Sequence, residues 1–121
     1  MSRTVAIIGA SDNEERYSYL AQKLLMEEGY RVVPISPLGK TILGVKGYRS
    51  LSDYDGGIDT VTMYVGPSRQ EAVVASILAK APRYILFNPG TENAEVERSL
   101  IQAGIVVERA CTLVLLRIGK F

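Results

Sequence analysis

The sequence predicts an α/β fold, a three-layer sandwich in which a parallel sheet of about five strands is covered by helices on both faces. Short apolar runs typical of buried strands alternate with stretches of about 10–15 residues that have helical spacing. The chain has 121 residues, of which 47% are hydrophobic and 22% charged, the size and balance of one folded domain. Because no repeat or linker interrupts the series, we expect residues 1–121 to form a single domain.

Two strands and a helix are predicted at the start of the chain. Thr4–Ile8 is an apolar run typical of a buried strand. Apolar residues then repeat at helical spacing between Tyr17 and Leu25, and Gly29 stands where a helix C-cap belongs. Arg31–Ile35 is apolar and β-branched, which indicates the second strand.

The middle of the chain contains an irregular segment, a strand and a helix. Glycines divide residues 40–50, which we expect to form a small hairpin or an irregular excursion. Residues 59–65 are predicted as the third strand. Ser68 and Glu71 have the spacing of a capping box, ahead of an amphipathic helix that carries Val73, Val74, Ile77 and Leu78.

The last third of the chain repeats the alternation. Tyr84–Phe87 is the fourth predicted strand, and residues 88–90 turn out of it. Residues 92–103 are predicted as a helix and residues 105–107 as a short fifth strand. Residues 112–116 fit a strand or a short terminal helix equally well.

The loops after the strands are the expected ligand site, because ligands of such sheets bind beyond the carboxyl ends of the strands. These loops are rich in Gly, Pro, Ser and Asn, and they are residues 9–11, 36–40, 66–68 and 88–90. Such residues allow a close approach to a ligand, although turns use them for their backbone chemistry alone. Tyr64, at the end of a strand, would stack on a base or pack as an ordinary aromatic.

The first of these loops has the pattern of a phosphate site. Thr4–Ile8 runs directly into Gly9, Ala10 and Ser11. A parallel strand that ends in a tight glycine turn before a helix exposes backbone N–H groups at the positive end of the helix dipole. The plainer interpretation is that Gly9 only makes the turn and that Ser11 only caps a helix.

The dinucleotide fingerprint is incomplete. Sites for NAD use Gly-x-Gly-x-x-Gly and an acidic residue about 20 positions further on. This turn has one glycine, and the second strand ends at Ser36, with Lys40 nearby, instead of at an acid. The residues therefore favour an adenine nucleotide that carries a phosphate on its ribose.

The composition excludes several classes of protein. The sequence has no histidine, which excludes Ser-His-Asp and Cys-His catalysis, and its single cysteine, Cys111, excludes an internal disulfide framework and a structural zinc site. A net charge of +1 provides no field for general nucleic-acid binding. No run approaches the roughly 18 apolar residues of a membrane span, and the first residues are unlike a secretory leader. We expect a cytoplasmic protein with no metal site.

Several blocks of the sequence together resemble the small stand-alone CoA-binding proteins, which are similar to the CoA-binding domain of the succinyl-CoA synthetase alpha subunit. The resemblance covers almost the whole chain. Its blocks are Val-Ala-Ile-Ile-Gly-Ala-Ser, Arg-Tyr-Ser at 16–18, Gly-Tyr-Arg-Val-Val-Pro-Ile-Ser-Pro at 29–37, Ile-Leu-Gly at 42–44, Tyr-Arg-Ser-Leu at 48–51, Ile-Asp at 58–59, residues 88–90, Ala-Gly-Ile-Val-Val at 103–107 and Cys111.

The resemblance implies a Rossmann-type fold with coenzyme A as its cofactor. It implies that the pyrophosphate meets backbone N–H groups and a hydroxyl of Gly9, Ala10 and Ser11. Arg16 and Ser18 match the family's Arg-x-Ser and would line the same pocket. The adenosine would lie near the end of the second strand, where Ser36 stands in place of the family's usual Asn before Pro37 and Lys40 follows in the same loop. Asn88 and Gly90 stand where the family usually has Gln-x-Gly, and with Tyr64, chosen for its place at a strand end, they complete the candidate contacts.

The resemblance and the residues together give one preferred function and two alternatives. The preferred function is binding of coenzyme A or an acyl-CoA without catalysis, by a chain that could form a homodimer. One alternative is an NAD(P)-binding oxidoreductase-like domain. The other is an interaction module with a degenerate nucleotide pocket, because Val65 and Gly66 stand where the family commonly has arginines.

Overall fold

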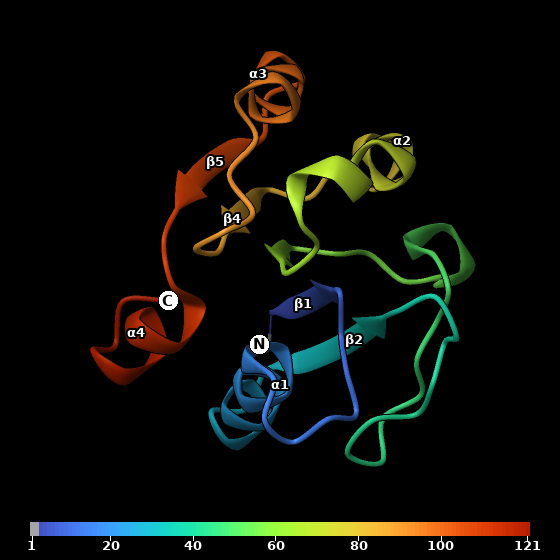
Figure 1. The fold of residues 1–121 in the computed structure, drawn as a ribbon, viewed down its shortest axis with the longest axis vertical. Coiled ribbons are helices and arrows are strands. Elements are labelled where there is room, and N and C mark those ends of the chain that lie inside the picture. The colour runs from blue at the N-terminus through green and yellow to red at the C-terminus, as the bar shows by residue number, and fades with distance from the viewer. Residues whose placement is uncertain (1–2) are drawn as a thin grey trace.

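The computed structural model describes residues 3–121 as a five-stranded sheet between two layers of helices, which confirms the predicted fold class (Figure 1). The first half of the fold comprises β1 (Thr4–Ile8), α1 (Tyr17–Glu27), β2 (Arg31–Ile35), η1 (Leu51–Asp53) and β3 (Thr60–Met63). The second half comprises η2 (Pro67–Arg69), α2 (Glu71–Lys80), β4 (Tyr84–Phe87), α3 (Ala94–Gln102), β5 (Val106–Arg109) and α4 (Thr112–Arg117). The elements η1 and η2 are short 3₁₀ helices.

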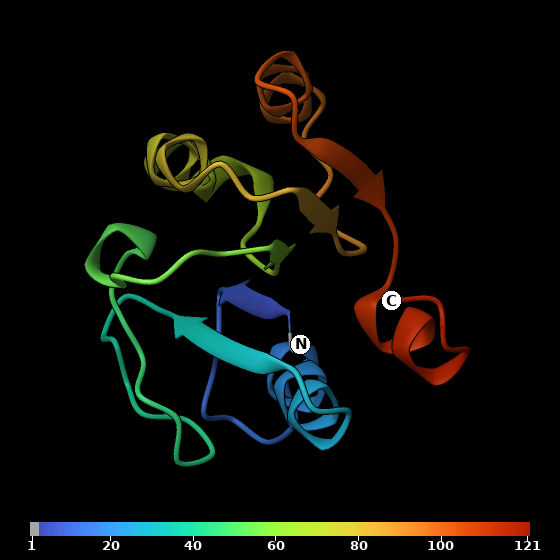
Figure 2. The same cartoon turned by 180° about the vertical axis from the view of Figure 1, so that it is seen from behind.

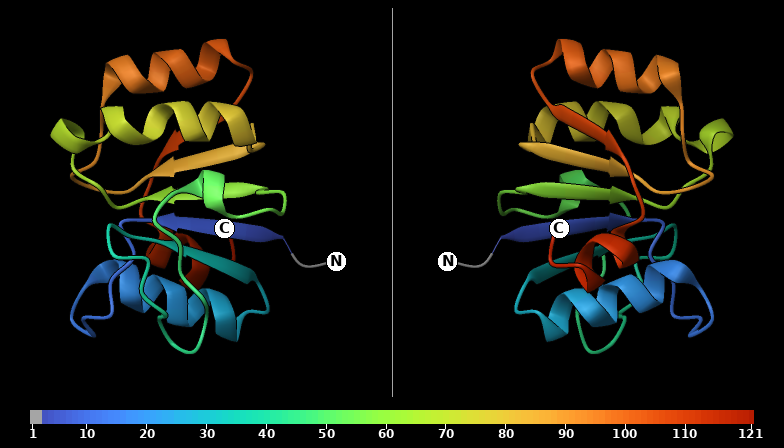
Figure 3. Two further views of the ribbon diagram at one scale, coloured as in Figure 1. Left: turned by 90° about the vertical axis from the view of Figure 1, so that its right-hand side faces the viewer. Right: turned by 90° about the vertical axis from the view of Figure 1, so that its left-hand side faces the viewer.

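The sheet is entirely parallel, with the strand order β2-β1-β3-β4-β5. Within each view of Figure 3, the arrowheads of the strands accordingly all point toward the same side of the molecule. The chain leaves β1 to build β2 on one side and then returns to build β3 on the other. The strand order therefore reverses between β1 and β3, and a crevice at their carboxyl ends is where such folds bind ligands.

Helices cover both faces of the sheet. The helices α2 and α3 lie together on one side, whereas α1 and α4 lie together on the other (Figures 1 and 2). Alternate residues of β1 serve the two layers: Ala6 and Ile8 join the core cluster under α2 and α3, whereas Val5 and Ile7 join the cluster under α1 and α4. Burial on both faces explains why β1 is apolar at every one of its buried positions.

The predicted capping box at Ser68 and Glu71 is wrong. Ser68 lies inside η2, and α2 begins at Glu71 after an N-cap at Gln70. The side chain of Gln70 is fully buried and donates to the backbone carbonyls of Val65 and Thr91, at 2.9 Å and 2.6 Å. The N-cap residue of α2 is thus held by loops that are distant from one another in the sequence, and no local sequence pattern indicates these contacts.

Other element boundaries differ from the prediction by a few residues. The third strand is Thr60–Met63, shorter than residues 59–65, and the fifth is Val106–Arg109 instead of residues 105–107. The predicted helix at 92–103 spans Ala94–Gln102, capped by Asn93, whose side chain accepts a hydrogen bond from the backbone of Val96. The ambiguous terminal segment is the helix α4.

The segment between β2 and η1 is irregular, as predicted. It contains one antiparallel bridge, between Ile42 and Val45, and Tyr48 then makes a parallel bridge with Ile35. In Figure 2 the segment, coloured from teal to green, leaves β2, loops outward and returns. This return brings residues after Tyr48 beside the carboxyl end of β2. Among the helices of residues 3–121, none has the length and apolarity that crossing a bilayer requires.

Candidate functional site

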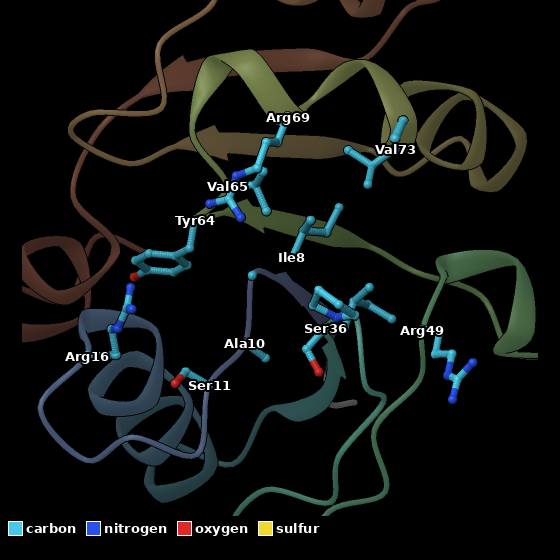
Figure 4. Close-up of a pocket in the computed structure, with 14 residues that line it drawn as sticks. Ile8, Ala10, Ser11, Arg16, Ser36, Arg49, Tyr64, Val65, Arg69 and Val73 are labelled. Carbon is cyan, nitrogen blue, oxygen red and sulfur yellow. The ribbon is translucent and has the colours of Figure 1, made fainter.

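A cavity of about 440 Å³ lies at the carboxyl edge of the sheet, where the strand order reverses (Figure 4). Its floor is formed by the ends of β1, β2 and β3, and its upper wall by η2 and the first turn of α2. The residues around it are Ile8, Gly9, Ala10, Ser11, Arg16, Ile35, Ser36, Pro37, Arg49, Tyr64, Val65, Arg69, Ala72 and Val73. Its volume falls within the range of about 300–1,000 Å³ that small-molecule sites occupy.

Two smaller cavities share walls with this one. The first, of about 290 Å³, shares Gly9, Arg16 and Tyr64 and extends toward the start of α1 and the loop after β4. The second, of about 250 Å³, shares Ala10, Ser11, Ser36 and Pro37 and extends along the loop after β2. We refer to the three cavities together as the trough. A trough of this kind suits a ligand that is longer than the central cavity.

The trough brings together ten of the eleven residues that the sequence singles out. Gly9, Ala10, Ser11, Arg16, Ser36, Pro37 and Tyr64 line the central cavity. Ser18 and Gly90 line the cavity beside α1, and Lys40 lines the cavity along the loop after β2. The eleventh, Asn88, lines none of the three cavities.

The side chain of Asn88 is buried beneath the loop after β4. Its amide nitrogen donates to the hydroxyl of Thr62 at 2.7 Å and to the carbonyl of Met63 at 2.9 Å, and its carbonyl oxygen accepts from the backbone N–H of Thr112 at 2.9 Å. These bonds tie β3, β4 and the start of α4 together. The structure therefore gives the side chain of Asn88 a role in stability.

Two of the three N–H groups that the sequence indicates at the first turn are engaged within the protein. The N–H groups of Gly9 and Ala10 both donate to the carbonyl of Ile35, each at 3.0 Å, because the pairing of β1 with β2 continues past the end of the strand. In contrast, the N–H groups of Ser11 and Asp12 donate to no acceptor within residues 3–121. The backbone donors open to an anion thus begin at Ser11, two residues later than expected.

The positive end of α1 points at the trough, although the helix begins some distance after the glycine. Its N-cap is Arg16, and its first residues, Tyr17 and Ser18, line the cavity beside α1. The first N–H groups of a helix have no partner inside the helix, and the helix dipole favours an anion in front of them. The segment from Ser11 to Ser18 therefore contains two separate sets of backbone donors, one at Ser11 and Asp12 and one at the start of α1.

Three arginines line the central cavity, namely Arg16, Arg49 and Arg69, and no carboxylate lines it. All three side chains belong to exposed residues, and none of them joins the ion pairs found among residues 3–121. Figure 4 shows Arg16 and Arg49 at opposite ends of the view, with Ser36 between them. Cations without acidic partners at one cavity are the arrangement expected of a site for several phosphates.

Sequence reasoning missed Arg49 and Arg69 as site residues. Arg69 follows the third strand at the predicted edge of the sheet, so its position carried a signal. Arg49 reaches the cavity only because Tyr48 bridges to Ile35, and no periodic pattern indicates that bridge. Arg49 and Arg69 thus add positive charge to the cavity, although Val65 and Gly66 stand where the family commonly has arginines.

Tyr64 stands between the central cavity and the cavity beside α1, and its hydroxyl points toward Arg16 in Figure 4. Burial raises the pKa of Tyr64 to about 12, and the neighbouring hydroxyls of Thr112 and Thr62 offset only part of this rise. The phenol therefore keeps its proton at neutral pH and can donate a hydrogen bond. Its ring packs against the core cluster under α1 and α4.

Lys40 already has a partner. Its ammonium lies 3.3 Å from a carboxylate oxygen of Asp12, and both residues line the cavity along the loop after β2. The pair links the loop after β1 to the loop after β2. Lys40 is thus less available to an anionic ligand than the three arginines are.

The chain is similar to known proteins over nearly its whole length. The family model described as "CoA binding domain" matches residues 3–117. An uncharacterized protein of Bacillus subtilis (strain 168), YneT, is 29% identical over 106 residues, which are 88% of this chain and 78% of that protein. A crystal structure of an uncharacterized protein superposes with a TM-score of 0.93 at 36% identity, covering 100% of this chain and 99% of the other.

A part of a larger enzyme is also similar. The acetate–CoA ligase (ADP-forming) of Methanocaldococcus jannaschii is 36% identical over 63 residues, which are 52% of this chain but only 9% of that protein. About half of this chain thus matches a small part of that ligase.

Proposed function

The chain belongs to the CoA-binding domain family, and from this premise we propose that it binds coenzyme A or an acyl-CoA in the trough and performs no chemistry of its own. The chain matches a small fraction of the ligase to which it is similar, so the reaction of that enzyme is not part of the proposal. The proposed role is to hold the ligand for sensing or carriage.

The observation that carries the proposal is the set of three arginines around a cavity that no carboxylate lines. Coenzyme A carries a diphosphate and a further phosphate on its ribose, and each guanidinium can make paired, charge-assisted hydrogen bonds to a phosphate. The excess of positive charge is local, because the whole chain has a net charge of only +1.

We place the diphosphate between Ser11 and Arg16. Ser11 and Arg16 line the central cavity, the N–H of Ser11 donates to no acceptor within residues 3–121, and Tyr17 and Ser18 at the positive end of α1 line the cavity beside it. Arg69 would approach the same anion from η2. This placement replaces the N–H groups of Gly9 and Ala10, which Ile35 already engages.

The adenosine would lie in the apolar part of the central cavity. Ile35 and Pro37 form one side of this part, and Val65, Ala72 and Val73 form the other. Flat aromatic bases bind between apolar walls of this kind, with a few polar groups to orient them. The extended arm of the ligand would then leave through the cavity beside α1, past Ser18 and Gly90.

The two alternatives predict different features of the pocket. An NAD-binding domain would carry an acid at the end of β2, where this chain has Ser36. A degenerate pocket would be filled by side chains, whereas this cavity measures about 440 Å³ and keeps three arginines. Both observations favour a ligand with several phosphates.

A thermal unfolding panel tests the proposal. The unfolding midpoint is measured with millimolar CoA, acetyl-CoA, NADP and NAD. A ligand at about 100 times its Kd adds roughly 2.7 kcal/mol to the free energy of unfolding, so CoA or acetyl-CoA is expected to raise the midpoint by several degrees. A shift with NADP but not with CoA would favour the oxidoreductase-like alternative, and no shift with any nucleotide would favour the interaction module.

The expected homodimer and the expected cytoplasmic location stay predictions. Sedimentation velocity at two protein concentrations tests the first, because the sedimentation coefficient of a reversible dimer rises with concentration.

A further inference from the structure

We infer that Arg49, and not Lys40, recognises the phosphate on the adenosine ribose of the ligand, and so sets the preference of this site for 3′-phosphorylated over unphosphorylated nucleotides. The inference rests on the proposed function, since it concerns the same trough. It assigns a specificity role to a residue that contributes to no ion pair within residues 3–121.

The backbone around Tyr48 brings Arg49 to the site. The N–H of Tyr48 donates to the carbonyl of Pro34 at 2.9 Å, and the N–H of Ser36 donates to the carbonyl of Tyr48 at 3.0 Å. These two bonds extend the pairing of β2 onto the returning segment, at the point where β2 leaves the sheet. Arg49 is the next residue, so it is fixed beside Ser36.

The loop after β2 is shaped to fit the stem of Arg49. Gly39 has a φ of +62°, and a Cβ placed on it would lie 3.2 Å from Cγ of Arg49 and 3.4 Å from its backbone nitrogen. A side chain at residue 39 would therefore press on the arginine as well as strain the backbone. The absence of a Cβ at Gly39 lets the arginine stem lie close to the loop that carries Ser36 and Pro37.

The position of Arg49 matches the ribose, whereas Arg16 matches the diphosphate. In sheets of this class the end of the second strand lies beside the ribose of a bound adenine nucleotide, and an arginine there accommodates the 2′-phosphate of NADP. The 3′-phosphate of CoA is carried by the neighbouring carbon of the same ribose. Ser36, at the end of β2, and Arg49 both line the central cavity. Figure 4 shows Arg49 on the far side of Ser36 from Arg16, so the two guanidinium groups suit two separate anions of one ligand.

Lys40 is the competing candidate, and its contacts argue against it. Its ammonium is paired with Asp12 at 3.3 Å, and it lines only the cavity along the loop after β2. A phosphate that engaged Lys40 would have to compete with this carboxylate and would approach its negative charge. Arg49 imposes no such cost, because no carboxylate lines the central cavity.

Calorimetric titration with CoA and with dephospho-CoA, which lacks only the ribose phosphate, tests the inference. The proteins are the unaltered chain, Arg49→Gln and the matched control Lys40→Gln. Arg49→Gln is expected to weaken CoA binding about tenfold and to change dephospho-CoA binding less than twofold. Lys40→Gln is expected to preserve the ratio of the two affinities. The unfolding midpoints without ligand show whether each variant is folded, and both residues are exposed enough for it to stay unchanged.

The remaining outcomes overturn the inference in different ways. An equal loss for both ligands in Arg49→Gln would mean that the arginine contacts the base or the diphosphate. If only Lys40→Gln abolishes the difference in affinity between CoA and dephospho-CoA, the lysine binds the ribose phosphate. If the unaltered chain binds neither ligand, the proposed function itself fails, and that result is distinct from the other two.

Discussion

Gly9 lies so close to Tyr64 that no other residue fits in its place. A Cβ built on Gly9 would be 2.9 Å from the carbonyl carbon of Tyr64 and 3.1 Å from its Cβ, and the backbone of Gly9 has a φ of +94°. The N–H of Tyr64 also donates to the carbonyl of Ile8 at 2.8 Å, which holds the ends of β1 and β3 together. The close approach of these two strand ends forms the floor of the trough.

Gly9→Ala is predicted to weaken both stability and ligand binding. The positive φ and the contact with Tyr64 together should reduce the free energy of unfolding by about 2–4 kcal/mol, and the displaced turn should lose affinity for CoA. Urea denaturation and calorimetry measure the two effects. Gly57→Ala is the matched control, because nothing lies within 4 Å of a Cβ at Gly57. Equal effects of the two substitutions would contradict the close packing.

Arg16→Gln and Arg69→Gln are each predicted to weaken CoA binding about tenfold, because each removes a charged donor from a cavity that no carboxylate lines. Binding should also weaken as salt is added, and less steeply in either variant. Because both arginines are exposed, stability should change by less than about 0.5 kcal/mol. The control is Arg98→Gln, an exposed arginine of α3 away from the trough. An unchanged affinity for CoA in both variants would show that neither arginine contacts the ligand.

Asn88→Ala is predicted to destabilise the protein by about 2–4 kcal/mol. The substitution removes three hydrogen bonds and leaves the buried N–H of Thr112 without its acceptor. Asn13→Ala is the control, since Asn13 is exposed and bonds only within its own turn. Chemical denaturation compares the two variants. If the Asn88→Ala protein keeps its stability and loses only its affinity for CoA, Asn88 contributes to ligand binding and the structural role is contradicted.

Tyr64→Phe is predicted to lose less stability in alkali than the unaltered chain. The pKa of Tyr64 is about 12 in the folded protein, against 10 in the unfolded chain. Below pH 10 both states keep the proton, whereas between pH 10 and 12 only the unfolded chain releases it, so ionisation of this residue favours unfolding. The cost is roughly 2–3 kcal/mol at about 1.4 kcal/mol per pKa unit. Urea denaturation at pH 9 and pH 11.5 measures it, and equal losses in both proteins would show that Tyr64 is not the group responsible.

The sequence predicts the buried strands best. Thr4–Ile8, Arg31–Ile35 and Tyr84–Phe87 have the bounds predicted for them, because strands covered on both faces are almost continuously apolar. The predicted capping box before α2 was wrong. The side chain of Gln70 instead binds the carbonyls of two distant loops, and no local pattern indicates these contacts.

The position of the site was predictable from the sequence. The backbone N–H groups and the arginine side chains available to a ligand there were not. The rule that ligands bind beyond the carboxyl ends of strands indicated the loops at Gly9, Ser36 and Tyr64, which do line one cavity. That the N–H groups of Gly9 and Ala10 are engaged by Ile35 depends on how β1 pairs with β2 past its end. Likewise, Arg49 reaches the cavity through a bridge between segments that the sequence pattern leaves unconnected.

The most direct test of a phosphate-binding trough is a titration of ¹⁵N-labelled protein with CoA, followed by NMR of the backbone amides. The free N–H groups of Ser11 and Asp12, and those of Tyr17 and Ser18 at the start of α1, are predicted to shift strongly and to saturate at one ligand per chain. Amides of α3 are predicted to stay unchanged. Saturable shifts confined to a separate cavity, which Glu71 and Val74 of α2 line together with Val96 and Ser99 of α3, would contradict the account, as would no shifts at millimolar CoA.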